Sequence, residues 1–249
     1  MSLLELDGLT VRYGGVTAVD NVGFTIEPGT LVGLIGPNGA GKTTLIDAVT
    51  GMVKCGGDIR LDGQSVTDWP AHRRSRAGII RTFQSLELFM ELTVRENLQT
   101  YARPHAGGPS GDPVGYALER LDVAWAADTY PSELSHGTAR LVSVARALAA
   151  GPRLLLLDEP AAGLDAQESQ ALGAKLRNLV DTGVTTILLV DHDVDLIMNV
   201  CDDIQVLDFG KRIASGPPSA VRENPEVARA YLGTDTSAEP VSGGTGGAA

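Results

Sequence analysis

Residues 36–43 read Gly-Pro-Asn-Gly-Ala-Gly-Lys-Thr and fit the spacing G-x-x-x-x-G-K-[ST] of a phosphate-binding loop. The apolar run 31–35 precedes this stretch, and the segment 44–49 follows it with three apolar side chains on one helical face. A strand, a glycine loop and a helix, in that order, are the context that such a loop requires. The sequence therefore predicts a phosphate-binding site between a buried strand and the start of a helix.

The chemistry of this loop assigns a role to each residue type. Glycines let several backbone N–H groups point inward at phosphate oxygens, and the following helix adds its positive end. Lys42 is expected to reach the β and γ phosphates, and the Thr43 hydroxyl to hold a magnesium ion. A glycine-rich turn with a nearby lysine is the structural alternative. The expected nucleotide contacts are Gly36, Pro37, Asn38, Gly39, Ala40, Gly41, Lys42, Thr43 and Thr44.

The charge balance bears on possible partners. The 249 residues include 20 Lys and Arg against 31 Asp and Glu, a formal charge of −11. An acidic surface repels nucleic-acid phosphates, so we expect no nucleic-acid partner. The basic segment 72–76 is interpreted as a solvated loop before a strand. The length suits one substantial core that could carry an inserted lobe.

Cysteine usage and hydropathy indicate the compartment. Cys55 and Cys201 lack the spacing of a metal or redox motif, and reduced thiols explain both. No apolar run approaches the length of about 18 residues that a membrane span needs, and the start does not read as a signal peptide. We expect a soluble cytoplasmic protein whose membrane role, if any, depends on partners.

The first part of the chain is rich in β pattern, and a helical pattern begins at about residue 85. A capping-box spacing at Thr93–Glu96 starts a stripe formed by Val94, Leu98 and Tyr101. A loop rich in glycine and proline spans 105–115. The expected strands are 3–13, 22–26 and 79–84 with a hairpin piece at 57–63, and the expected helices are 116–127 and 138–150.

An alternating α/β pattern resumes after residue 153. Leu154–Leu157 is wholly apolar, as in a strand of a parallel sheet that is covered on both faces. The next elements expected are a helix over 166–181 that ends near Gly183, a strand over 184–190, a hairpin over 204–214 and a helix that ends at 232–233. The tail 234–249, dominated by small and polar residues, is expected to be disordered.

Polar side chains follow two of the apolar strands at the point where each ends. Ligands bind beyond the carboxyl ends of parallel strands, so these residues should meet the phosphate loop. Asp158 is placed to hold magnesium through water, and Glu159 to orient or deprotonate an attacking water. His192, after the other strand, could sense the γ-phosphate. A surface acid and a structural histidine are the alternatives for Glu159 and His192.

The stretch 134–138, Leu-Ser-His-Gly-Thr, is not explained by a generic phosphate-loop enzyme. With it, the chain resembles the nucleotide-binding subunit of ATP-binding cassette (ABC) transporters over roughly residues 3–233. The ordered set that carries the resemblance is the phosphate loop, Gln84, the segment 134–138, the carboxylates at 158–159, Gly163-Leu164-Asp165 and His192.

The resemblance implies further roles for matching positions. Tyr13 would stack on adenine, and Gln84 would touch the magnesium ion or the attacking water. Ser135 and Gly137 would contact the γ-phosphate of ATP held by an opposite subunit, while Asp165 would lie at the seam between the two subunits. Lys42, Gln84, Glu159 and His192 form the implied catalytic set, and Thr43, Gln84 and Asp158 the implied metal set.

The resemblance also implies an α/β fold: a P-loop NTPase core with a parallel sheet, an N-terminal antiparallel β subdomain and an inserted helical subdomain. The ATPase domain would span 1–233, with its core at about 1–84 and 154–233 and the helical subdomain at about 85–153. The chain departs from the family pattern L-S-G-G-Q at two positions. His136 replaces the first glycine of the pair and Thr138 the glutamine.

Finer matches at 81–84, 88–89, 92–98, 224–226 and 231–233 look like the ATPases of branched-chain amino acid importers, and urea-type importers and the lipopolysaccharide exporter share much of them. The implied function is ATP- and Mg²⁺-dependent powering of amino acid uptake, or of a urea- or amide-like solute. Implied partners are a second ABC ATPase, identical or related, permease subunits at the inner face of the membrane and a solute-binding protein. Apolar residues at 86, 88 and 89 could form a groove for a permease helix, or be core. A soluble scaffold or regulator ATPase and an export ATPase remain alternatives.

Overall fold

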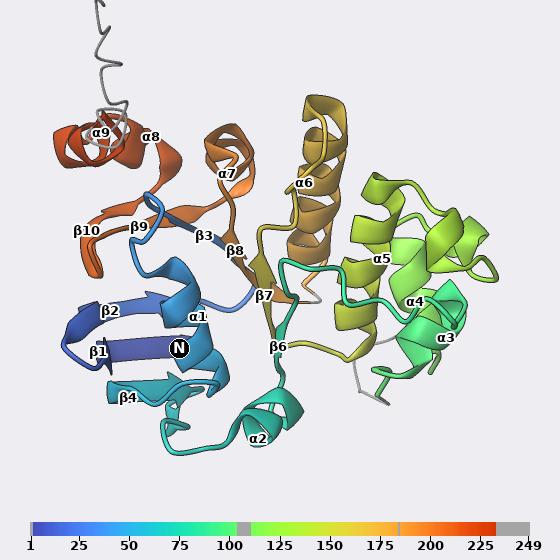
Figure 1. The fold of residues 1–249 in the computed structure, drawn as a ribbon, viewed down its shortest axis with the longest axis horizontal. Coiled ribbons are helices and arrows are strands. Elements are labelled where there is room, and N and C mark those ends of the chain that lie inside the picture. The colour runs from blue at the N-terminus through green and yellow to red at the C-terminus, as the bar shows by residue number, and fades with distance from the viewer. Residues whose placement is uncertain (1, 104–110, 184, 233–249) are drawn as a thin grey trace, which may run out of the picture.

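The computed structural model describes residues 2–103, 111–183 and 185–232 (Figure 1). The strands in this part of the chain are β1 (Leu4–Tyr13), β2 (Val16–Ile26), β3 (Leu31–Ile35), β4 (Gly56–Leu61), β5 (Gln64–Ser65), β6 (Ile79–Arg81), β7 (Leu154–Asp158), β8 (Thr186–Val190), β9 (Asp203–Asp208) and β10 (Lys211–Gly216). The helices are α1 (Lys42–Thr50), α2 (Ala71–Arg76), α3 (Val94–Gln99), α4 (Pro113–Arg120), α5 (His136–Ala149), α6 (Ala166–Asp181), α7 (Val194–Val200), α8 (Pro218–Arg222) and α9 (Pro225–Leu232), with 3₁₀ turns at Ala124–Ala126 and Pro131–Glu133.

Within the described residues the strands form two sheets. The larger has the order β10-β9-β3-β8-β7-β6, and its neighbours are parallel except for the hairpin of β9 and β10. The smaller, β2-β1-β4-β5, is antiparallel. Because β3, β7 and β8 run in the same direction, the phosphate loop and the two polar strand ends lie at one edge of the larger sheet. The predicted α/β fold, with its parallel sheet and N-terminal antiparallel sheet, is confirmed.

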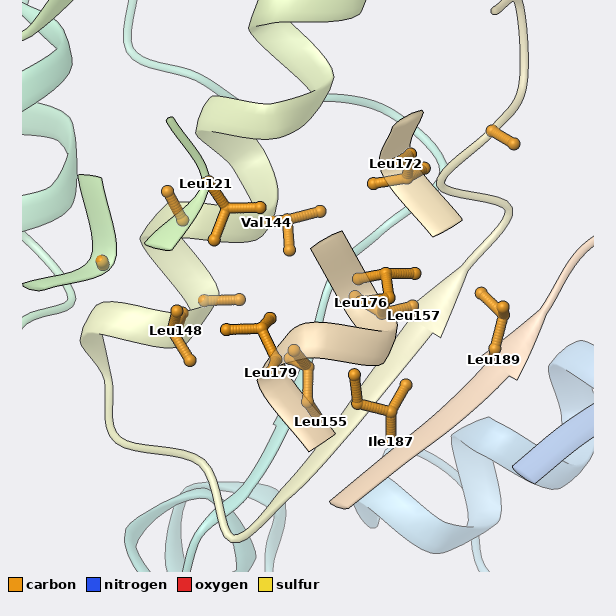
Figure 2. Packing of buried hydrophobic residues seen from close by; sticks show 14 of the residues in the cluster. Leu121, Val144, Leu148, Leu155, Leu157, Leu172, Leu176, Leu179, Ile187 and Leu189 are labelled. Atoms are coloured by element: carbon orange, nitrogen blue, oxygen red, sulfur yellow. The ribbon is translucent and has the colours of Figure 1, made fainter. Parts of the chain in front are cut away.

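Apolar clusters on both faces of the larger sheet explain why β7 is continuously apolar. The four leucines 154–157 are fully buried. Leu155 and Leu157 of β7 pack in one cluster with Val144 and Leu148 of α5 and with leucines of α6, as Figure 2 shows. Leu154 and Leu156 belong to the cluster on the opposite face. Full burial of such a side chain is worth about 1.5–3 kcal/mol, so β7 anchors both layers.

The helical insertion begins later than its sequence pattern indicated. The segment 85–93 is irregular, and α3 starts at Val94 after the capping box of Thr93 and Glu96, which is confirmed. Val94 and Leu98 are buried as predicted, but Tyr101 follows the helix and is exposed. The loop expected over 105–115 ends earlier than predicted, because α4 starts at Pro113. Residues 105–110 of this loop lie outside the described residues.

The basic segment 72–76 is a helix, not the solvated loop that was predicted. It forms most of α2, and Arg74 within it is buried. The Arg74 guanidinium donates to the carbonyl oxygens of Ala48 and Val49 at 2.6 and 2.9 Å, which lie in the last turn of α1. A helix end leaves carbonyl groups without partners in its own helix. Arg74 therefore satisfies carbonyl groups at the C-terminal end of α1, the helix that follows the phosphate loop.

Other boundaries differ by a few residues, and a second helix besides α2 was not predicted. Strand β2 starts at Val16, β6 ends at Arg81, β8 starts at Thr186, and a short helix, α7, follows β8. The expected C-terminal helix is two helices, α8 and α9. Position 184, Gly233 and the tail 234–249 lie outside the described residues. In the described part of the chain, no helix combines the length and apolar character needed to cross a membrane.

Candidate functional site

The phosphate loop joins β3 to α1 and depends on glycine at two crowded positions. Gly36 has φ 153° and Gly41 has φ 100°, within the region that side-chain-bearing residues rarely adopt. A Cβ on Gly36 would overlap the carbonyl oxygen of Leu207, and one on Gly41 would overlap that of Ala18. The loop can therefore lie against β9 and β2 only because these two residues lack side chains.

Lys42 opens α1 and turns its side chain back over the loop. Its Nζ donates to the carbonyl oxygens of Gly36 at 2.6 Å and Pro37 at 3.0 Å, and the residue is buried. Burial lowers the pKa of Lys42, and the nearby carboxylates of Glu159 and Asp158 oppose that shift. The ammonium is thus a charged group in a polar, partly desolvated loop, as phosphate binding requires.

A cavity of about 210 Å³ opens at this loop. It is lined by Ala18, the loop residues 38–44, Glu159 and His192. The structure therefore brings the predicted loop together with two of the three predicted strand-end side chains. Tyr13 is half exposed at the tip of β1 and is not among the described residues that line the cavity.

Glu159 follows β7 in a backbone conformation that few non-glycine residues adopt. Its φ is 50°, and its N–H donates to the carbonyl oxygen of Val190 at 2.7 Å. Such conformations cost free energy and concentrate at functional sites. The carboxylate is held on both sides: Nε2 of Gln84 donates to Oε2 at 2.6 Å, and Nε2 of His192 lies 2.5 Å from Oε1. Two other segments, those that carry Gln84 and His192, thus converge on the Glu159 carboxylate.

Asp191 supports this arrangement and was not assigned a role from sequence. It is buried, and its carboxylate accepts from the N–H groups of Ala161 at 2.9 Å and Asp193 at 3.0 Å. Burial raises the pKa of Asp191, while these backbone N–H groups act in the opposite direction. The side chain ties the segment after Glu159 to the turn that carries His192. Its only signal in the sequence was its position at a strand end.

Asp158 lies beneath Glu159 and is paired with an arginine. The Oδ2 atom of buried Asp158 accepts from Nη2 of Arg81 at 2.7 Å, and the same guanidinium forms an ion pair with Asp47 of α1. Arg81 was not predicted as a site residue. A possible signal was an arginine directly after the apolar pair Ile79-Ile80 of a short strand.

The residues 135–137 and Asp165 lie at helix starts outside the cavity. The Ser135 hydroxyl caps α5 by accepting from the N–H of Thr138 at 3.2 Å. The Asp165 carboxylate caps α6 by accepting from Gln167 and Glu168. Gly137 is buried, and a Cβ on it would overlap the Glu168 carboxylate.

His136 connects these two helix starts. Its Nε2 lies 3.2 Å from the carbonyl oxygen of Ala162, and its ring packs on Gly163. A carbonyl oxygen only accepts hydrogen bonds, so Nε2 is the donor in this contact. The residue that departs from the family pattern thus joins the segment 134–138 to the turn before Asp165.

Among the described residues, no cluster of three or more His, Cys, Asp or Glu side chains could hold a metal alone. The metal set implied by the resemblance is Thr43, Gln84 and Asp158: Thr43 lines the cavity, Gln84 donates to Glu159, and Asp158 accepts from Arg81. Oxygen ligands suit Mg²⁺, which usually keeps several waters and binds substrate phosphates as well. This donor set fits a Mg²⁺ ion that arrives with a phosphate ligand.

Two family descriptions match the chain. Residues 19–162 match the family described as ABC transporter, and residues 211–236 match the one described as branched-chain amino acid ATP-binding cassette transporter. The first match contains the loop, Gln84, the segment 134–138 and the carboxylates 158–159. The second starts in β10 and extends past α9.

Curated relatives cover nearly the whole chain. The branched-chain amino acid transport ATP-binding protein BraF of Pseudomonas aeruginosa is 38% identical, over 93% of this chain and 98% of that protein. LivG of Escherichia coli, of the same description, is 39% identical with the same coverage. The lipopolysaccharide export ATP-binding protein LptB of Escherichia coli is 34% identical, over 94% of this chain and 99% of that protein.

Solved structures share the fold. A nucleotide-free ATP-binding cassette from an ABC transporter superposes with a TM-score of 0.83, at 28% identity, over 93% of this chain and 99% of that chain. A dimeric post-hydrolysis cassette bound to ADP and phosphate gives a TM-score of 0.72, at 25% identity, over 86% of this chain and 98% of that chain.

Proposed function

The chain belongs to the ABC transporter ATP-binding family, and from that premise we propose that it hydrolyses ATP to drive uptake of branched-chain or other small amino acids through a membrane permease. One observation carries the catalytic part of this proposal. The Glu159 carboxylate lies between Gln84 and His192 at the mouth of the phosphate-loop cavity. A carboxylate held in this way can orient a water for in-line attack on a γ-phosphate.

The neighbouring groups suit the rest of the reaction. Lys42 supplies positive charge for the β and γ oxygens, and the loop N–H groups and the start of α1 add to it. Mg²⁺, when bound with ATP, would neutralise charge on the same oxygens. The Thr43 hydroxyl, the Gln84 amide and, through water, the Asp158 carboxylate would hold it. His192 would hold Glu159 in place and sense the γ-phosphate.

Two subunits would share two ATP molecules. Ser135 and Gly137 stand at the start of α5 but outside the cavity, which supports a role toward the nucleotide of an opposite subunit. A helix start favours negative charge, so α5 would attract a γ-phosphate. Asp165 would lie at the seam and Tyr13 against adenine. The dimeric cassette with a similar fold supports this arrangement.

The choice of amino acids as substrate rests on the relatives' names. BraF and LivG are described as branched-chain amino acid transport proteins, and the match at 211–236 carries the same description. LptB, from an export system, is less similar. We propose permease subunits and a solute-binding protein as partners, and a location at the inner membrane face. The ATPase core would comprise about 1–84 and 154–233, and the helical subdomain about 85–153.

The surface beside β6 is the proposed permease contact. Of the three residues predicted for this groove, Leu88 belongs to the core, Leu86 is half-buried against it, and Phe89 is exposed. A cavity of about 170 Å³ lies nearby and is lined by nine residues: Thr50, Met52, Ala71, Ser75, Ile79, Ile80, Arg81, Phe83 and Tyr101. We define these nine residues as the β6 groove. Its exposed Met52, Phe83 and Tyr101 suit the apolar face of a cytoplasmic helix.

Reconstitution tests the proposal. The chain would be co-expressed with the permease subunits encoded beside its gene, and the complex placed in vesicles with the matching solute-binding protein. ATP-dependent uptake of labelled leucine is expected, with none for a Glu159→Gln complex. A purified ATPase that forms dimers with ATP but captures no permease subunit would instead support the scaffold alternative. Uptake of urea or an amide in place of leucine would show that the transported solute is not an amino acid.

A further inference from the structure

Arg81 contacts the catalytic end of the sheet with one edge of its guanidinium. It is the last residue of β6, and only 7% of its side chain is exposed. Nη2 donates to Oδ2 of Asp158 at 2.7 Å, and Nη1 pairs with the Asp47 carboxylate of α1. One buried cation therefore bridges the strand end that precedes Glu159 and the helix that follows the phosphate loop.

The other side of the same guanidinium faces the β6 groove. Its Cζ lies 5.1 Å from the centre of the Phe83 ring, and Nη1 lies 3.7 Å from Sδ of Met52. Phe83 is 38% exposed and Met52 is 55% exposed. A cation over an aromatic face is stabilised by the ring, so a ligand that moves Phe83 changes the environment of Arg81.

The charge of Arg81 bears directly on metal binding. A buried arginine is stable only when paired, and here one of its partners is the carboxylate that we assign to Mg²⁺. A guanidinium and a divalent cation compete for the negative charge of Asp158 and repel each other. A tighter Arg81–Asp158 pair therefore weakens Mg²⁺ binding, and a looser pair strengthens it.

We propose that Arg81 is a positioning residue that couples occupancy of the β6 groove to Mg²⁺ binding at Asp158. A permease helix in the groove displaces the Phe83 ring, alters the hold of Arg81 on Asp158 and so changes the affinity for the Mg²⁺–nucleotide complex. Such coupling is reciprocal, so nucleotide binding changes permease affinity by the same factor. This inference rests on the proposed function, which supplies the metal and the groove's occupant.

Mg²⁺ titrations of the full-length chain test the coupling. Binding of a fluorescent, non-hydrolysable ATP analogue is followed as Mg²⁺ is raised, so the readout does not depend on turnover. Arg81→Met, which keeps the unbranched stem but removes the guanidinium and its charge, is expected to lower the half-saturating Mg²⁺ concentration about three- to tenfold, since one unit of positive charge leaves the site. Arg60→Met, which breaks the exposed Arg60–Asp58 pair on β4, is the control and should leave it unchanged.

Phe83→Ala tests transmission from the groove. It is expected to shift the Mg²⁺ half-saturation in the same direction as Arg81→Met, by a smaller factor. In the double variant with Arg81→Met it should add nothing, because the side chain that transmits the effect is gone. Arg81→Lys keeps the charge and should lie between wild type and Arg81→Met; it serves if Arg81→Met does not fold.

Two results would overturn the inference. One is a folded Arg81 variant, with native circular dichroism, whose Mg²⁺ dependence equals that of wild type. The other is a Phe83→Ala shift that persists in the Arg81→Met background. A wild-type chain that binds the analogue equally with and without Mg²⁺ would instead refute the metal assignment of the proposed function. The two failures are therefore distinguishable.

Discussion

The Nε2 atom of His192 lies 2.5 Å from Oε1 of Glu159, across the ends of the neighbouring parallel strands β8 and β7. Gln84, which follows β6, donates to the other carboxylate oxygen. The direction of the Glu159 carboxylate is thus set by two other strand ends of the sheet. This explains how a residue in a costly left-handed conformation keeps one orientation at the cavity.

Replacement of Glu159 by Gln tests the role of the carboxylate. The amide keeps the size and the hydrogen bond from one neighbour but cannot accept a proton from water. We expect turnover to fall about 100-fold or more, the usual range for loss of a general base, while ATP binding is retained. The ATP-bound dimer should persist, as seen by size-exclusion chromatography. Glu91→Gln, at an exposed position, is the matched control; equal hydrolysis by the two variants would refute the assignment.

Gly41 and Gly39 form a matched pair within the loop. Both have positive φ, but a Cβ on Gly41 would overlap the carbonyl oxygen of Ala18, whereas Gly39 has open space. Gly39→Ala is expected to cost only backbone strain, on the order of 1 kcal/mol. Gly41→Ala must displace β2 or the loop, so ATP affinity should fall at least about tenfold further. Calorimetric titration and thermal melts of both variants measure this; similar affinities would show that the loop adapts.

Features whose signal is local in sequence could be predicted. The phosphate loop, the capping box at Thr93 and the apolar run before Asp158 each contain their own physical cause within a few residues. The helix over 166–181 was predicted to the residue, because its leucines recur at helical spacing and Gly183 follows its end in a left-handed conformation. Convergence of strand ends followed from parallel order alone.

Features that depend on distant partners could not be predicted. The segment 72–76 reads as a solvated run until Arg74 is seen against the carbonyl groups of α1. From sequence, Arg81 is only a strand residue; its ion pairs with Asp47 and Asp158, far away in sequence, appear only in the structure. In both cases an arginine that composition places on the surface is buried by tertiary hydrogen bonds.

Ser135 carries a structural and a proposed catalytic role that can be separated. Ser135→Arg removes the cap of α5, which costs about 1 kcal/mol, and places a bulky cation where an opposite subunit's nucleotide would bind. Cooperative ATP hydrolysis should be abolished, while ATP affinity of the isolated monomer stays unchanged. Asp112→Ala, which removes the cap of α4, should lower stability alike but leave cooperativity intact. If monomer affinity collapsed with Ser135→Arg, the shared-site arrangement would be wrong.

Asp58 gives a prediction for pH dependence. Hydrogen bonds from Ser65, Thr67 and Arg60 lower the pKa of Asp58 to about 2, below its ordinary value of about 3.9. The stabilisation is therefore present above the ordinary value and is lost as pH falls through the folded-state value. Asp58→Asn should be less stable than wild type at neutral pH, and the gap should shrink below pH about 4. Urea unfolding across pH measures the gap.

The control for that series is an exposed ion pair. Asp128 is 89% exposed and lies 3.5 Å from Arg95, a geometry that contributes little to stability. Asp128→Asn should therefore match wild type at every pH. If the stability difference between Asp58→Asn and wild type stayed constant as the pH was lowered, the hydrogen bonds, and not the charge, would be what stabilises β4.

Variants of His136 test whether this residue, which replaces a glycine of the family pattern, contributes to the proposed dimer site. Its contact with the Ala162 carbonyl ties the start of α5 to the turn before Asp165, so both should move together when two subunits close. His136→Ala breaks this tie, and the ATP concentration for half-maximal hydrolysis should rise about threefold, the cost of one neutral hydrogen bond, with monomer binding unchanged. His136→Gln, which restores an N–H donor, should recover part of the loss. His72→Ala, at an exposed site, is the control and should leave the half-maximal ATP concentration unchanged. A normal half-maximal concentration in His136→Ala would mean that the two helix starts act independently.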